Sequence, residues 1–316
     1  MKNKSVFITG GAGYIGTTLI PELLQRNYKV TVYDSLLFNN GDKLLPYISN
    51  PNFTFIKGDI RDFDNLKLSL VSYDTVIHLA ALVGFPICRE KGYSESYDVN
   101  VIGTQNVINA MSKDQFLLYG STGSNYGVVD GICTEETPLN PLSIYAKTKT
   151  AAEIAVLERE NSTAFRFATA FGLSPRLRLD LLVNDLTYKA ATESYAVIYE
   201  SHFMRTFIHV RDIARVFLFA IDNQQQMVNN VYNVGSNSMN YSKKDICEII
   251  KEQLPDTYFD YADVGSDADK RNYIVSYEKI NKLGFDTTID IRTGITELIA
   301  AMPLIRTYSP YYNVLK

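Results

Sequence analysis

Short apolar runs alternate with longer helical patterns through the first 170 residues of the chain. Runs rich in β-branched and aromatic side chains predict strands at residues 5–9, 29–33, 53–56, 75–79, 116–119 and 163–167. Between them, apolar residues recur with helical spacing over residues 14–26, 99–111 and 145–160. Strands this short and apolar are typical of parallel sheets covered by helices on both faces. The pattern therefore predicts an α/β fold with a doubly wound parallel sheet, which binds ligands beyond the carboxyl ends of its strands.

The regular alternation ends after about residue 168. Pro175, Arg176 and Arg178 indicate a loop, and the elements predicted beyond it are strands at residues 196–199 and 206–208 and helices at 213–222 and 243–254. No linker-like segment separates the two parts of the chain. We therefore expect a first domain over residues 1–170 and a smaller α/β region over residues 171–316, partly interleaved with it.

Composition and charge exclude several classes of protein. The 316 residues are 46% hydrophobic and 21% charged, which is ordinary for a globular protein and excludes wholesale disorder. The 31 basic and 35 acidic side chains leave a net charge of −4, so the charge balance does not favour nucleic acid or an anionic membrane as a partner.

The sequence also bears on location and on metal binding. No apolar run approaches the ~18 residues of a membrane span, and the apolar segment near the amino terminus is too short for a signal peptide. We therefore expect a cytoplasmic protein. Cys88, Cys133 and Cys247 lie far apart without a CxxC pair, which predicts reduced thiols and no metal site.

A glycine cluster follows directly after the first predicted strand. Gly10, Gly13 and Gly16 have the spacing GxxGxxG, and Gly11, Gly13 and Gly16 have the spacing GxGxxG. Glycines here permit a tight turn, let the backbone approach a pyrophosphate and bring the next helix close to the strand. A flexible turn is the alternative. Because a strand precedes the cluster and a helical pattern follows it, we predict a dinucleotide-binding loop.

Acidic residues follow the next two predicted strands. Asp34 ends the second strand, where a carboxylate hydrogen-bonds the adenosine ribose hydroxyls and repels a 2′-phosphate. No Arg follows it directly, so the sequence favours NAD over NADP. A helix-capping or turn Asp is the alternative. Asp59 lies in a second acidic turn after the third strand, where the adenine would lie.

A candidate proton relay involves one helix and one turn. Tyr145 and Lys149 are four residues apart, so they share one face of a predicted helix. A phenol has a pKa of about 10, and a nearby ammonium group and a positive nicotinamide ring would lower it. Thr122 lies just after the fifth predicted strand, and its hydroxyl could bond the same substrate oxygen. A surface Tyr beside a solvated Lys is the alternative.

In this order, the motifs resemble those of the extended short-chain dehydrogenase/reductase superfamily, in its group of NAD-dependent nucleotide-sugar epimerases and dehydratases. The resemblance runs over almost the whole chain and includes TGGAGYIG at 9–16, GDIRD at 58–62, HLAA at 78–81 and the Tyr145/Lys149 pair. Residues 205–212 resemble the segment whose first Arg holds the diphosphate, and residues 269–271 a stretch that contacts the nucleotide. The resemblance implies a Rossmann-type sheet that binds NAD.

The resemblance also implies roles for individual residues. The catalytic residues would be Thr122, Tyr145 and Lys149. The residues that hold NAD would be Gly10, Gly13, Tyr14, Ile15, Gly16, Asp34, Asp59, Ile60, Leu79, Ala80, Ala81 and Asn100. The nucleotide-sugar contacts would be Ser124, Thr169, Asn184, Arg205, Asp269 and Arg271. For Arg176, Arg178 and Arg271, surface charge is the alternative to substrate contact.

The chain departs from the family pattern at two places. Family members that dehydrate a 4-keto sugar carry Asp-Glu directly after the Thr, and decarboxylating members carry a Glu there. This chain has Gly123 and Ser124, so both reactions are disfavoured. The usual Asn of the FNxYGP segment is Thr169 here, which affects how the substrate phosphate is bound.

These observations predict oxidation of a nucleotide-diphosphate sugar at C4. The resemblance to UDP-glucose 4-epimerases favours a 4-epimerase, in which the hydride returns to the other face of the keto sugar. The alternative is a net 4-dehydrogenase or 4-ketoreductase, because residues 174–185 and 269–271 are similar to sugar 4-dehydrogenases of surface-polysaccharide pathways, such as GDP-heptose 4-dehydrogenase. A non-catalytic NAD-binding scaffold is a competing class. Family members pair through helices like 99–111 and 145–160, so we expect a homodimer.

Overall fold

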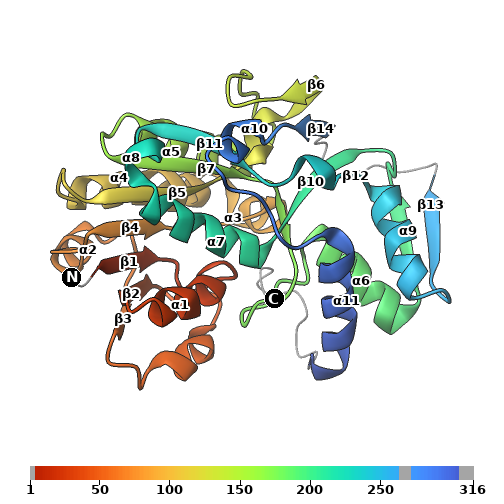
Figure 1. Ribbon diagram of the computed structural model, residues 1–316, viewed down its shortest axis with the longest axis horizontal. Coiled ribbons are helices and arrows are strands. Elements are labelled where there is room, and N and C mark those ends of the chain that lie inside the picture. Colours follow the sequence, from red (N-terminus) through yellow and green to blue (C-terminus); the bar gives the residue numbers. More distant parts are fainter. Residues whose placement is uncertain (1–3, 263–271, 306–316) are drawn as a thin grey trace.

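The computed structural model describes residues 4–262 and 272–305 (Figure 1). A parallel sheet lies at its centre, with the strands β1 (Ser5–Thr9), β2 (Lys29–Asp34), β3 (Phe53–Lys57), β4 (Thr75–His78), β5 (Phe116–Thr122), β7 (Ser162–Phe167) and β11 (Asn230–Val234). Their spatial order is β11-β7-β5-β4-β1-β2-β3, and every neighbouring pair is parallel. The order reverses between β1 and β4, which opens a crevice at the carboxyl edge. The predicted doubly wound α/β fold is confirmed.

Helices cover both faces of this sheet, because alternate side chains of each strand point to opposite faces. Val6 and Ile8 of β1 belong to a core with one set of helices, whereas Phe7 belongs to a core with the other set. The helices of the first face are α1 (Gly16–Gln25) and α7 (Val210–Asp222), which contact each other. Those of the second face are α2 (Phe63–Ser69), α4 (Gly103–Ala110) and α5 (Ile144–Leu157).

A second core forms most of the carboxyl-terminal region, at the right of Figure 1. Its helices are α6 (Leu182–Glu193), α9 (Lys243–Gln253) and α11 (Ile291–Ala301). Two small sheets belong to it, one with strands β8 (Thr169–Phe171), β10 (Met204–His209) and β12 (Asn240–Ser242), the other with β9 (Tyr195–Tyr199) and β13 (Tyr258–Ala262). The remaining turns and short helices are η1 (Gly41–Tyr47), η3 (Gly123–Tyr126), α8 (Gln224–Met227), η4 (Asn237–Met239), α10 (Glu278–Asn281) and η5 (Met302–Leu304).

The two parts of the chain exchange elements. Strand β11 and helix α7 follow residue 171 in the sequence, yet they complete the larger sheet and its first face. Conversely, β14 (Asn272–Val275) pairs with β6 (Val128–Cys133) from the first part. The division into domains 1–170 and 171–316 stays a prediction, and these exchanges are the interleaving that it has to accommodate.

Three elements differ from the sequence predictions. The helix predicted over 99–111 begins as a π-helical turn, η2 (Asp98–Ile102), and becomes α4 at Gly103, where any side chain would collide with Ile60. Helix α3 (Phe85–Tyr97) was not predicted, because it has no apolar stripe and Gly92 interrupts it with φ of 78°. Strand β5 continues beyond residue 119 to Thr122, so Thr122 is the last residue of the strand.

Candidate active site

A cavity of about 380 Å³ lies at the carboxyl edge of the large sheet. It is lined by residues that follow β1, β2, β3, β4 and β5, together with residues of α5 and of the segment around Arg176. The predicted site residues that line it are Gly10, Gly13, Tyr14, Ile15, Gly16, Asp34, Asp59, Ile60, Leu79, Ala80, Ala81, Thr122, Ser124, Tyr145, Lys149 and Thr169. Most of the predicted site therefore surrounds one cavity of ordinary ligand-binding size. We call the part lined by Asp34 and Asp59 the acidic end, and the part lined by Thr122 and Tyr145 the reaction end.

The glycine loop forms a close-fitting cradle between β1 and α1. Gly10 has a φ of +71°, and a Cβ atom there would lie 2.5 Å from the amide nitrogen of Ala80. A Cβ atom on Gly16 would collide with the backbone of Gly11. Helix α1 begins at Gly16 with no side-chain cap and no acidic residue in its first turn, so its amino terminus can face a phosphate group. The loop therefore fits the pyrophosphate of a dinucleotide.

Asp34 is held at the acidic end by backbone amides. Its carboxylate accepts hydrogen bonds from the amides of Ala12 (3.0 Å) and Leu36 (2.8 Å), one on each oxygen. Burial raises the pKa of Asp34, and these bonds together with the charge of Arg176 oppose that rise. Each carboxylate oxygen keeps a lone pair for a ribose hydroxyl.

Sequence reasoning missed other residues at the acidic end. Asn40 donates to the carbonyl oxygen of Ala12 (2.6 Å), and its buried Oδ1 has no hydrogen-bond partner in the described part of the chain. Arg176 lies over the ring of Phe38, 5.3 Å from its centroid. All three side chains line the cavity. A polar residue in the loop after β2 is a weak signal for Asn40, whereas no local pattern could have linked Arg176 to Asp34.

Asp59 forms an ion pair at the rim of the acidic end. Arg61 donates to it from Nη2 (2.6 Å) and Nε (3.0 and 3.1 Å), and these hydrogen bonds lower the pKa of Asp59. Glu95 of α3 also lines the cavity and adds to the negative charge felt by Arg61. The carboxylates that line the cavity in the described structure are thus Asp34, Asp59 and Glu95, all at this end.

The predicted catalytic side chains meet at the reaction end. Thr122 accepts a hydrogen bond from the amide of Ser124 (3.2 Å), and its hydroxyl donates to the hydroxyl of Ser124 (3.1 Å). Lys149 is 3% exposed, and its Nζ lies 4.0 Å from the centroid of the Tyr119 ring. Burial lowers the pKa of Lys149 to about 7, although the carboxylate of Glu153 opposes that change. Tyr145 lines the same cavity one helical turn before Lys149.

Local capping and a buried amide hold α5 in place. The side chain of Ser143 caps the helix by accepting from the amide of Ala146 (3.1 Å), which puts Tyr145 in the first turn. Asn100 does not line the cavity. Its amide instead bonds both backbone groups of Leu82 and donates to the hydroxyl of Thr148 (3.0 Å). Asn100 therefore connects α5 to the segment after β4.

Two predicted substrate residues, Asn184 and Arg205, do not line the cavity in the described structure. Asn184 accepts from the amide of Gly172 (2.9 Å) and donates to the carbonyl oxygen of Arg178 (2.8 Å), so its amide organises the loop between them. Arg205 is buried and donates to the carbonyl oxygen of Met204 (3.0 Å). Asp269 and Arg271 lie outside the described residues. Thr169 does line the cavity, and its buried hydroxyl has no hydrogen-bond partner among the described residues.

The alternative of surface charge is wrong for Arg176 and Arg178. Both side chains line the cavity and are only 3% and 8% exposed. Arg178 forms a two-pronged ion pair with Asp180, at 2.6 and 3.1 Å. Burial disfavours both charges, but the attraction between the two side chains is stronger than this effect. The pKa of Arg178 is therefore raised and that of Asp180 is lowered. Tyr145 adds to the field that keeps Arg178 charged, which associates this Arg with the reaction end.

Comparison with known proteins gives the family. Residues 6–235 match the model of the NAD dependent epimerase/dehydratase family. The chain belongs to this family. NAD is therefore its cofactor, and the predicted resemblance is confirmed.

Individual relatives in the family differ in their reactions. The chain is 28% identical to human dTDP-D-glucose 4,6-dehydratase, over 94% of this chain and 89% of that one. It is 25% identical to UDP-glucose 4-epimerase of Corynebacterium glutamicum, over 78% and 79% of the two chains. Its fold matches UDP-glucuronic acid 4-epimerase from Bacillus cereus, crystallised with UDP-glucuronic acid and NAD, with a TM-score of 0.83 and 24% identity over 95% of this chain and 99% of that chain. Family membership thus leaves the reaction to be argued from the site.

Neither a membrane-spanning helix nor a metal-binding cluster is present in the described residues. None of the helices in residues 4–262 and 272–305 combines the length and apolar composition needed to cross a membrane. In the same residues, no group of three or more His, Cys, Asp and Glu side chains is placed to hold a metal ion. Cys88, Cys133 and Cys247 are buried free thiols.

Proposed function

We propose that this protein is a nucleotide-sugar 4-epimerase that oxidises the C4 hydroxyl of its substrate and then reduces the ketone from the other face. One observation carries the proposal: Thr122, Tyr145 and Lys149 line the same cavity as the glycine cradle and Asp34. The hydroxyl, phenol and ammonium groups thus lie beside the cofactor-binding loop of an NAD-dependent family. We assign the cofactor contacts to the predicted residues that line the cavity, with Asn40 and Arg176 added.

The chain's own residues would supply the acid–base chemistry. Tyr145 as phenolate takes the proton of the 4-hydroxyl, and Thr122 hydrogen-bonds the same oxygen. When protonated, Lys149 favours the phenolate, because a positive charge in a low-dielectric site strongly stabilises a nearby negative charge. When bound, NAD supplies the hydride acceptor. In the reverse half-reaction, Tyr145 returns its proton to the C4 oxygen.

The side chains at the reaction end argue against dehydration and decarboxylation. The resemblance assigns those reactions to carboxylates next to the Thr, and this chain has Gly123 and Ser124 there. The carboxylates that line the cavity in the described structure are all at the acidic end. No described carboxylate at the reaction end is therefore placed to abstract a proton from C5 while Tyr145 acts on C4.

Hydrogen bonds join the glycine loop and helix α1 to the segment 172–176. The hydroxyl of Tyr14 donates to the carbonyl oxygen of Gly172 (2.7 Å), and the hydroxyl of Ser174 donates to the carbonyl oxygen of Tyr14 (2.7 Å). The amide of Arg176 also contacts the hydroxyl of Thr17 (3.4 Å). The segment 172–176 is therefore joined to the loop that binds the cofactor. We propose that this anchored loop helps to retain NAD, which an epimerase requires because the same cofactor must return its hydride to the sugar.

Incubation with UDP-, GDP-, dTDP- and CDP-sugars tests the reaction. We expect a C4 epimer to form without net NADH, measured by anion-exchange chromatography, by NMR of the sugar and by absorbance at the NADH band. Accumulation of a 4-keto sugar with NADH would establish the alternative, a net 4-dehydrogenase. A 4-keto-6-deoxy product would show that the enzyme is a dehydratase, contrary to the proposal.

The remaining assignments concern the substrate and the assembly. We assign the nucleotide diphosphate to Asn184, Arg205, Asp269 and Arg271, as the resemblance implies, and Arg205→Ala should raise KM for every nucleotide sugar.

We also propose a cytoplasmic homodimer that acts in surface-polysaccharide biosynthesis and pairs through η2, α4 and α5. Ile102 and Ile154 are exposed apolar residues on two of these helices. Light scattering tests the dimer, and a monomer would contradict it.

A further inference from the structure

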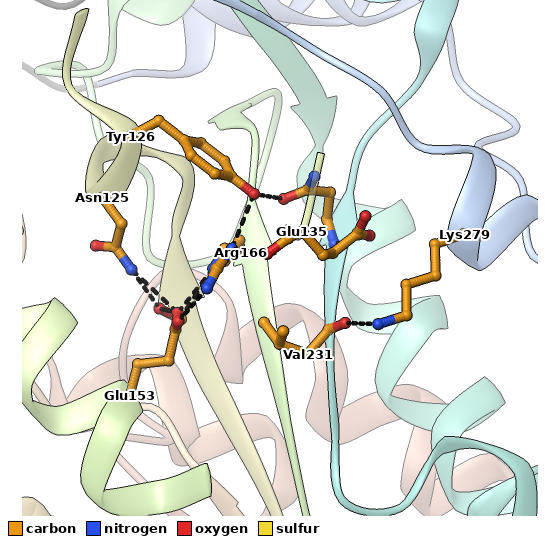
Figure 2. Close-up of polar contacts among 9 residues, drawn as sticks. Asn125, Tyr126, Glu135, Glu153, Arg166, Val231 and Lys279 are labelled. Atoms are coloured by element: carbon orange, nitrogen blue, oxygen red, sulfur yellow. Dashed lines mark hydrogen bonds and ion pairs between the residues drawn. The ribbon is translucent and has the colours of Figure 1, made fainter. Parts of the chain in front are cut away.

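Glu153 and Arg166 form a buried ion pair, shown in Figure 2, and neither residue lines the cavity. Glu153 of α5 is 1% exposed and accepts hydrogen bonds from Nη2 (2.7 Å) and Nε (3.0 Å) of Arg166. It also accepts from the hydroxyl of Ser121 (2.5 Å) and from Nδ2 of Asn125 (3.0 Å). The carboxylate thus has donors on both oxygens. A buried charge needs this degree of compensation to be tolerated.

The donors to Glu153 flank the catalytic threonine. Ser121 is the residue before Thr122 on β5, and Asn125 lies in the η3 turn that follows it. Figure 2 shows the side chains of Asn125 and Arg166 converging on the carboxylate from different elements. Because Glu153 binds both sides of the turn, it restrains the position of the Thr122 backbone relative to α5.

Glu153 also lies one helical turn after Lys149 on the same face of α5. Its charge is the largest influence that keeps Lys149 protonated against the effect of burial. Three further groups contact or influence Lys149, namely Tyr119 on β5, His78 on β4 and Cys88 on α3. Tyr145 precedes it by one turn of α5. His78 is neutral, because burial and the charge of Lys149 lower its pKa to about 3. Among these groups, Glu153 is the one that carries a carboxylate, so it supplies the negative charge that favours the Lys149 ammonium.

We propose that Glu153 is a positioning residue of the reaction, which keeps the Lys149 ammonium charged and holds the turn that presents Thr122. The proposal rests on the proposed oxidation at C4, in which both residues take part. Arg166 orients Glu153, and it is itself anchored by donating to the hydroxyl of Tyr126 (3.0 Å) and to the carbonyl oxygen of Glu135 (3.0 Å). Burial disfavours the Arg166 cation, but Glu153 outweighs that effect and raises the pKa of Arg166.

The main test is the substitution Glu153→Gln, which removes the charge of the side chain and keeps its shape. Lys149 should then lose its proton at a pH lower by about one unit or more, because the opposite charge with the largest influence on it is gone and Arg166 is left uncompensated. The readout is the pH dependence of acetic anhydride labelling of Lys149 in the protein without NAD, quantified by peptide mass spectrometry. Lys147, exposed on the same helix, is the internal reference.

The matched control is Tyr126→Phe. It removes a hydroxyl that contacts Arg166 at its far side and donates to Oδ1 of Asn233 (2.6 Å), but it leaves all the bonds to Glu153 in place. We expect it to lower stability without changing the labelling profile of Lys149. An equal shift in both variants would mean that loss of packing, not loss of the Glu153 charge, moves the profile, and would overturn the proposal.

The kinetic test uses turnover of the sugar substrate. Glu153→Gln should lower kcat about tenfold near neutral pH, narrow its pH profile and leave KM and NAD affinity nearly unchanged. Ser121→Ala, which removes a neutral donor, should lower kcat severalfold and leave the profile in place, and it keeps the proposal testable if the Gln variant does not fold. A folded Glu153→Gln protein with an unchanged labelling profile, or an unchanged kcat in Ser121→Ala, would overturn the proposal. If the parent protein turns over no sugar, the proposed function fails, and the labelling still decides the role of Glu153.

Discussion

The two ends of the cavity differ in the charge that lines them. At the acidic end, the carboxylates of Asp34, Asp59 and Glu95 outnumber the cations of Arg61 and Arg176. At the reaction end, Lys149 and Arg178 are buried cations, and the neighbouring lining groups are hydroxyls. The acidic end suits the neutral hydroxyls of a ribose, whereas the reaction end suits an anionic substrate and a phenolate. A net charge of −4 over the whole chain conceals this separation.

The largest expected effect concerns the reaction end alone. Tyr145→Phe should reduce kcat about 10³-fold, because it removes the acid–base group and leaves the ring in place. The dissociation constant for NAD, measured by fluorescence titration, should change little, because the acidic end is intact. Activity close to that of the parent protein would show that Tyr145 is not the acid–base group.

The next effect concerns the cofactor loop. Gly10→Ala should weaken NAD binding about 100-fold in the same titration, because the new methyl group would lie 2.5 Å from the amide nitrogen of Ala80 and φ is +71°. Gly92→Ala is the matched control, with φ of +78° but no atom within 4 Å of its Cβ position. It should lower stability modestly and leave NAD affinity unchanged. Equal losses of affinity in both variants would contradict the cradle.

Acid should destabilise both regions of the molecule through a buried histidine in each. Burial lowers the pKa of His78, beneath the cavity, to about 3, and that of His209, in the carboxyl-terminal region, to about 4. Both rings ionise near 6.5 when unfolded, so their contribution to stability is complete above that pH and declines as the pH falls toward 4 and then 3. Each should contribute roughly 1.4 kcal/mol per pH unit in that window.

Urea unfolding at several pH values measures this dependence. His209→Gln should flatten the decline between about pH 6.5 and 4. His78 offers a weaker variant, because Thr9 and Thr104 both bond its ring, at 2.6 and 2.9 Å, and any replacement also loses these bonds. An unchanged slope in a folded His209→Gln protein would show that His209 is not the group that titrates.

The smallest expected effect separates the two carboxylates of the acidic end. Asp34→Asn should weaken NAD binding about tenfold and narrow the preference for NAD over NADP, because a charge that repels a 2′-phosphate is lost. Asp59→Asn should change either affinity less, since Arg61 already pairs with Asp59. Isothermal titration with both cofactors makes the comparison. Equal losses of NAD affinity in the two variants would show that Asp34 and Asp59 contribute equally to cofactor binding, contrary to this prediction.

Much of the glycine loop and the acidic end could be predicted, because their structure depends on residues that are close together in the sequence. The glycine spacing, the strand before it and the acidic residue at the end of β2 are local patterns, and the backbone conformation at Gly10 depends on consecutive residues. Tyr145 and Lys149 were predictable for the same reason, because one helix determines their relative position. That Asn100 and Asn184 bond backbone groups could not be predicted, because the sequence gives no sign of which partner an amide will find.

The sequence by itself determined the alternation of strands and helices, the cofactor loop and the spacing of the catalytic pair, since each depends on short-range geometry. Only the tertiary structure decided that Arg176 approaches Asp34, that β11 completes the sheet and that Glu153 joins Arg166 behind Thr122. These contacts join residues far apart in the chain. They form because buried charges and the edges of the sheet need partners in the folded protein.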